Sequence, residues 1–154
     1  MSDLRYPRAA IAGALVAISL LPGVARAADI VIERPWSRAT PPGATVGAGY
    51  LVIRNTGKSA DRLVGAATPA AAMVQVHEIR MADGEMQMRE VDDLEIPAGG
   101  SVHLEPGGLH LMLMDLVAPL VTGTTVPVTL EFAGAGRVPV ELAVAPPGAP
   151  GPTP

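Results

Sequence analysis

Short runs of alternating apolar and polar residues recur about every ten residues along most of this 154-residue chain, and most of them end at glycine or proline. Such alternation is typical of β-strands with one buried face. After residue 27 no long apolar pattern with the helical period of about 3.6 residues is present. The sequence therefore predicts an all-β domain, an antiparallel sandwich or barrel of short strands.

The two ends of the chain differ from this pattern. Residues 1–27 combine Arg5 and Arg8, an apolar run of 13 residues and the motif Ala25-Arg26-Ala27, which together indicate a cleaved export signal. The run is shorter than the roughly 20 residues of a membrane-spanning helix, so we expect a periplasmic protein with no membrane span after cleavage. We expect residues 28–145 to form one β domain and the Pro/Gly-rich residues 146–154 to be disordered.

Charge and cysteine content exclude several classes of protein. Removal of residues 1–27 leaves 14 acidic and 8 basic residues, a net charge near −6 that argues against nucleic acid as a partner. The chain has no cysteine, so disulfides and a lipid anchor on an N-terminal cysteine are not expected. Blue-copper electron carriers bind copper through a cysteine thiolate and are excluded for the same reason.

One segment, residues 73–114, holds all three histidines and every methionine except Met1. Histidine is the commonest metal ligand, and the thioether of methionine is a soft donor. Their concentration in one segment predicts a site for a soft metal, with Cu(I) as the first candidate. Since most methionines on strands only fill a core, spacing must decide which of these are ligands.

Strand geometry groups these side chains. Residues 109–116 alternate so that His110, Met112 and Met114 share one face, while Leu111 and Leu113 share the other, which we expect to be the core side.

Upstream, Asp83-Gly84 predicts a two-residue hairpin turn. In that register Met81 faces Met86, Ile79 faces Met88 and His77 faces Glu90. His77 and Met88 are then diagonal neighbours on one face, roughly 7–8 Å apart.

The spacing of four of these residues resembles that of a known family. Ten residues separate His77 from Met88, twenty-one separate Met88 from His110, and one separates His110 from Met112. This pattern is similar to the motif of the periplasmic copper chaperones called PCuAC. The surroundings of the motif are similar too, over about residues 36–144, and the similar segments include 34–57, 95–100 and 106–116.

The resemblance implies a cupredoxin-like Greek-key barrel that binds Cu(I) through His77, Met88, His110 and Met112. It implies a chaperone rather than an enzyme, a monomer that receives copper from or delivers it to another periplasmic protein, with the copper centre of cytochrome c oxidase as one destination. Met81, Met86, Glu90 and Met114 lie on the ligand faces and are candidates for rim or supporting positions, whereas His103 lies outside the motif.

Two other interpretations stay open. The methionine-rich face can be a contact surface of an exported β-sandwich interaction module, in which case partner binding does not depend on copper. The second interpretation is a copper redox enzyme, which requires a Cu(II) site beside a substrate pocket. The tail has no histidine or methionine, so no second metal site is expected there.

Overall fold

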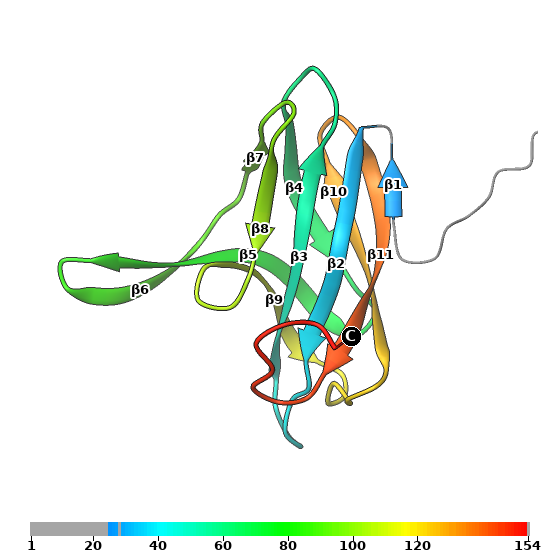
Figure 1. Cartoon of the computed structure of the whole chain (residues 1–154). Coiled ribbons are helices and arrows are strands. Elements are labelled where there is room, and N and C mark those ends of the chain that lie inside the picture. The colour runs from blue at the N-terminus through cyan, green and yellow to red at the C-terminus, as the bar shows by residue number, and fades with distance from the viewer. Residues whose placement is uncertain (1–24, 28, 154) are drawn as a thin grey trace, which may run out of the picture.

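The computed structural model describes residues 25–27 and 29–153, and all its regular elements are β-strands (Figure 1). The strands are β1 Ala25–Ala27, β2 Ile30–Arg38, β3 Val46–Asn55, β4 Asp61–Ala67, β5 Ala71–Ala82, β6 Glu85–Glu90, β7 Leu94–Ile96, β8 Ser101–Leu104, β9 Leu109–Leu116, β10 Thr125–Phe132 and β11 Gly136–Ala145. Within these described residues, no helical segment has the length and hydropathy that a membrane crossing requires.

Seven strands close into a barrel. They follow one another in the order β2-β11-β10-β4-β5-β9-β3, and pairing of β3 with β2 completes the ring. Neighbours are antiparallel except β11 and β2, which run parallel over Ala143–Ala145 and Trp36–Arg38. Three further strands pair with members of the ring: β1 with β2, β7 with β4 and β8 with β3. The expected all-β barrel is therefore confirmed.

The barrel interior is filled by alternate residues of its strands. Leu111 and Leu113 on β9, and Val74 and Val76 on β5, point inward and are buried. The intervening residues of both strands lie on the opposite face, as the alternation of β9 predicts. The outer face of β5 and β9 therefore carries side chains that the core does not need.

The end of β5 and all of β6 form a hairpin that projects away from the barrel (Figure 1), which we call the arm, residues 77–90. Its turn residues Asp83 and Gly84 both have positive φ, 53° and 78°, as a two-residue turn that matches the strand twist requires. The predicted register is confirmed: Met81 pairs with Met86, Ile79 with Met88, and His77 with Glu90.

The structure differs from the sequence expectations in two places. Pro35 predicts the end of the first core strand, but β2 continues to Arg38, because a bulge at Arg34, with a φ of 50°, accommodates the proline. Residues 69–73 predict a turn or a single helical turn, but residues 71–73 already belong to β5.

The tail, which we expected to be disordered, makes contacts with the barrel through Ala149. Arg38 Nε donates a 2.8 Å hydrogen bond to the carbonyl oxygen of Ala149, and Ala149 packs against Trp36 and Tyr50. Most of the expected signal segment, residues 1–24, lies outside the described residues, whereas Ala25–Ala27 pair with β2.

Candidate metal centre

The structure brings two histidines together from strands far apart in the sequence. His77 on β5 is the direct cross-strand partner of His110 on β9, and their ring centroids are 6.1 Å apart. The planes of the rings are inclined by 56°. His110 is only 5% exposed, although it lies on the face opposite the core leucines. The two imidazoles therefore form a preformed pair at the base of the arm.

The turn before β9 orients His110. Its Nδ1 lies 3.0 Å from the carbonyl oxygen of Gly108. A carbonyl oxygen only accepts hydrogen bonds, so Nδ1 carries the proton and the neutral ring keeps its lone pair on Nε2. The turn is closed by hydrogen bonds from Gly108 N to Glu105 O, 3.1 Å, and from Glu105 N to Leu109 O, 2.8 Å. A positive φ of 87° at Gly107 allows this tight turn.

A glutamine on the same strand orients His77. Nε2 of His77 lies 3.0 Å from Oε1 of Gln75, so Nε2 donates and the lone pair of the neutral ring is on Nδ1. This Nδ1 is buried, and in the described part of the chain it is the only buried side-chain nitrogen or oxygen without a hydrogen-bond partner. Buried polar atoms are rarely left unpaired, and a metal ion is one partner that satisfies a bare imidazole nitrogen.

The two motif methionines lie on the same face as the histidine pair. Met112 is half-buried on β9, where Gln75 and Ala48 are its neighbours on the two adjacent strands. Met88 is on β6 of the arm, opposite Ile79 and diagonal to His77, and is 52% exposed. His110 and Met112 therefore lie on the barrel, His77 lies where the arm joins it, and Met88 lies on the projecting part of the arm.

The remaining candidates also lie on this face. Met81 and Met86 pair near the tip of the arm, and Met114 pairs with Met73 on the barrel. Neither hydrophobic cluster of the core includes a methionine. Glu90 is exposed opposite His77, but the imidazole hydrogen bonds go to Gln75 and Gly108.

The kinds of donor present indicate which metals fit. Among the described residues, no three or more histidine, aspartate or glutamate side chains gather as a metal-binding group. Glu78, next to His77, bonds Arg89 instead, at 3.2 Å. Hard cations prefer carboxylate and carbonyl oxygens, so two imidazoles with neighbouring thioethers fit a soft ion better.

Gln75 is the site residue that the sequence reasoning missed. The sequence feature that could have identified Gln75 is its position two residues before His77, since residues two apart on a strand share a face. A glutamine there supplies an acceptor for one ring nitrogen and so determines which nitrogen faces a metal.

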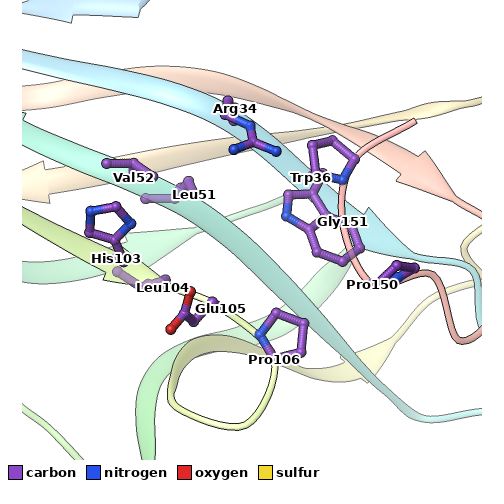
Figure 2. Close-up of a pocket in the computed structure, with 11 residues that line it drawn as sticks. Arg34, Trp36, Leu51, Val52, His103, Leu104, Glu105, Pro106, Pro150 and Gly151 are labelled. Atoms are coloured by element: carbon purple, nitrogen blue, oxygen red, sulfur yellow. The ribbon is translucent and has the colours of Figure 1, made fainter. Parts of the chain in front are cut away.

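A separate cavity of about 190 Å³ lies beside β2, β3 and β8, with the tail along one wall (Figure 2). Figure 2 shows Trp36 next to Pro150 and Gly151, and His103 with Glu105 on the side of β8. His103 pairs with Val52 rather than with the other histidines. The third histidine is therefore not part of the pair.

Known proteins share this fold and much of the sequence. A family model described as "Putative lipoprotein LpqE-like" matches residues 30–144. The putative lipoprotein Lxx21020 of Leifsonia xyli subsp. xyli (strain CTCB07) is 38% identical over 120 residues, which are 77% of this chain and 71% of that protein.

Solved structures extend the comparison. The copper-bound PCuAC domain from PmoF2 is 30% identical, with a TM-score of 0.70, and the match covers 80% of this chain and 98% of that domain. The Cu(I) form of DR1885 from Deinococcus radiodurans, solved in solution, is 35% identical with a TM-score of 0.56, over 72% of this chain and 74% of that one. The cupredoxin-like barrel that the motif implied is thereby confirmed.

Proposed function

We propose that this chain, which belongs to the LpqE-like family of putative lipoproteins, is an exported copper chaperone that carries Cu(I) on the face of β5 and β9. Its proposed ligands are His77, Met88, His110 and Met112. Similarity to PCuAC domains whose structures contain copper supports the cargo, and the lipoprotein names of its relatives support export. We propose that residues 1–27 are removed and that the mature monomer works in the periplasm.

One observation carries the proposal: the cross-strand pair of His77 and His110, in which the lone pair of each ring is free. Nδ1 of His77 is buried without a partner, and Nε2 of His110 is left as an acceptor by the bond of Nδ1 to Gly108. Both rings are already oriented by Gln75 and Gly108, so metal binding needs little rearrangement.

The donor set favours Cu(I) over competing ions. Imidazoles bind many divalent ions, but thioethers are soft donors that select Cu(I) over Zn(II) and Cu(II). The absence of cysteine suits an oxidising compartment, because thioethers and imidazoles bind Cu(I) without forming disulfides.

The position of Met88 supports transfer rather than storage. Every residue of β6 is exposed, so an acceptor's ligands can replace this thioether while the histidines still hold the ion. The acceptor or donor is another periplasmic copper protein, and assembly of the copper centre of a respiratory oxidase is the destination that resemblance suggests. No catalytic step is part of this proposal.

The test is an anaerobic titration of the exported protein with Cu(I) in competition with a chromogenic chelator. Wild type is compared with Met88→Leu and Met112→Leu, which keep side-chain volume while removing sulfur. We expect one tightly bound Cu(I), weakened by each substitution while the circular dichroism spectrum stays unchanged. Affinity indifferent to both substitutions would rule out the thioether ligands.

A pH series adds a check on the histidines. Only neutral imidazole binds metal, so the affinity for Cu(I) should fall as the solution is acidified from about pH 8 to about pH 5. Thioethers do not titrate in this range, so a flat profile would show that histidines are not ligands.

The exposure of the methionines also favours a second candidate, an interaction module with a methionine-rich contact face. Met81 and Met86 are 66% and 73% exposed at the tip of the arm. Under this alternative, Met81→Ser with Met86→Ser abolishes binding to a periplasmic partner in the presence of a Cu(I) chelator. Under the chaperone proposal, any such binding depends on copper.

A further inference from the structure

All six described methionines lie in one row with the histidine pair. On β5, Met73, His77 and Met81 recur every four residues, so they share a face at intervals of roughly 13 Å. Each has a soft donor directly opposite: Met114 on β9, His110 on β9 and Met86 on β6. The two motif methionines occupy the intervening rungs, with Met112 opposite Gln75 and Met88 opposite Ile79.

The row is symmetrical about the histidines. On one side Met73, Met114 and Met112 form a group of three thioethers on the barrel, and on the other Met81, Met86 and Met88 form a second group on the arm. Side chains directly opposite in a sheet have Cβ atoms about 4.5–5.5 Å apart, and diagonal ones are about 7–8 Å apart. Methionine has three rotatable bonds after Cα, so three sulfurs at these spacings can converge on one ion.

Core packing does not account for these side chains. Met73, Met81, Met86 and Met88 are between 48% and 73% exposed, and Met112 and Met114 are half-buried without joining a core cluster. Leucine would fill such surface positions with less cost in side-chain entropy. What distinguishes methionine from leucine at an exposed position is its sulfur.

We propose that these two groups are additional sites for a soft monovalent ion, one on each side of the histidine pair. The barrel group comprises Met73, Met112 and Met114, and the arm group Met81, Met86 and Met88. Each group shares one methionine with the proposed four-ligand site, so Cu(I) can move along the row without leaving its last sulfur. No electron is transferred, because thioether ligands are exchanged for one another while copper stays monovalent. This inference rests on the proposed function, which supplies the ion.

Thioethers alone bind Cu(I) more weakly than a site that includes imidazole, because imidazole is the stronger donor. Ions should therefore occupy the histidine site first, which engages Met88 and Met112, and later ions should bind each group through its two remaining thioethers. An ion arriving at the tip of the arm can be captured there, pass to the histidines and leave from the barrel group, or travel in the reverse direction.

The experiment uses the exported protein labelled with ¹³C at its methionine methyl groups and titrated with Ag(I), a redox-stable stand-in for Cu(I). The first equivalent should shift the signals of Met88 and Met112, and later equivalents those of Met73 and Met114 and of Met81 and Met86. Met73→Leu with Met114→Leu should remove one weakly bound ion and leave the first equivalent unchanged. Met81→Leu with Met86→Leu should do the same for the other group.

A control measures what a single exposed thioether binds. Val121 is 58% exposed in the loop after β9, and Val121→Met places a lone methionine there. Its signal should stay unshifted at Ag(I) concentrations that saturate both groups. If it shifts together with theirs, the groups are no better than isolated methionines and the inference is overturned.

The outcomes separate this inference from the proposed function. Shifts of Met88 and Met112 alone, with the other four signals unmoved at excess Ag(I), overturn the additional sites and leave the histidine site standing. A different result would separate the two ideas in the other direction. If the first equivalent leaves the imidazole signals unmoved but the signals of the two outer pairs still shift, the additional sites are supported and the four-ligand site is refuted.

Discussion

Gln75 determines which nitrogen of His77 keeps its lone pair for the proposed metal site. Its Oε1 accepts a hydrogen bond from Nε2, with 3.0 Å between the two atoms, so Nδ1 keeps the lone pair. Gln75→Leu removes this acceptor, leaves the ring free to turn, and should weaken Cu(I) binding by about 10- to 100-fold, as the loss of such supporting groups commonly does. A chelator-competition titration measures the change.

Two further variants make this test specific. Gln75→Glu keeps an acceptor oxygen and should retain most of the affinity. Gln87→Leu makes the same change on the exposed strand β6, opposite Arg80, and should have no effect. Equal losses in Gln75→Leu and Gln87→Leu would mean that Gln75 does not orient His77.

At this scale the sequence predicted some features and missed others. The faces of His110, Met112 and Met114 followed from alternation along one strand. The pairing of His77 with His110 did not, because it joins β5 to β9, which have three strands between them in the sequence, and depends on how the barrel closes. The support from Gln75 was recognised only from the contact of its Oε1 with Nε2 of His77 in the structure.

At the scale of elements, the turn of the arm depends on Gly84. Its φ is 78°, and a Cβ there would meet no atom within 4 Å, so the cost of Gly84→Ala is backbone strain alone. A residue other than glycine in this conformation costs about 1–2 kcal/mol. Because an exposed hairpin is only marginally stable, this substitution should speed hydrogen exchange in β6 while leaving the barrel protected.

Asparagine adopts positive φ more readily than other residues, so Asp83→Asn is the matched control and should leave exchange in the arm unchanged. Exchange that accelerates equally in β9 would show that the arm and the barrel open together. The two parts should exchange separately because the barrel has its own closed ring of hydrogen bonds.

Asp61 links the start of β4 to the turn between β10 and β11. Burial alone raises the pKa of Asp61, but hydrogen bonds from the backbone N–H groups of Gly134, Arg62 and Ala135 outweigh it and lower the pKa below its ordinary value of 3.8. The distances are 2.7, 2.7 and 2.9 Å respectively.

Since the pKa is lower in the folded state, this carboxylate stabilises the fold above its unfolded pKa, and the contribution disappears as the pH falls through the folded value. Asp61→Asn should lower the free energy of unfolding by about 1 kcal/mol at neutral pH. The difference from wild type should shrink below about pH 4 in urea unfolding. The exposed Glu141→Gln should show neither effect, and a loss that does not change with pH would contradict the role of the charge.

At the scale of the whole molecule, the tail covers the aromatic pair outside the barrel. Trp36 and Tyr50 stack with ring centroids 4.6 Å apart, and Ala149 packs against them. Burial raises the pKa of Tyr50, although the charge of Arg38 acts in the opposite direction.

Deletion of residues 146–154 should therefore shift the emission of the single tryptophan to longer wavelength and lower the pKa of Tyr50 towards its ordinary value of 10.0. Fluorescence and the absorbance of the tyrosinate measure these changes. Affinity for Cu(I) should be unchanged, because the tail is not part of the methionine row. Unchanged emission would show that the tail does not shield Trp36.

The overall architecture was the easiest feature to predict, because strand alternation and Gly/Pro turns are local signals. The hairpin at Asp83-Gly84 has its expected register for the same reason. The contacts of the tail with Trp36 and Arg38 were not apparent from the sequence, because composition alone shows that a segment cannot form a core, not whether it packs against one. The bulge at Arg34 was also not apparent from the sequence, since Pro35 suggested the end of a strand.

The alternation of β9 couples the core of the barrel to its outer face. Leu111 and Leu113 point into the barrel because His110, Met112 and Met114 point out of it. A slip of one residue in the pairing of β9 would turn the thioethers inward and the leucines to solvent. A chain misaligned in this way would lack the proposed copper ligands on its outer face, so the register that fills the core is also the register that the proposed site requires.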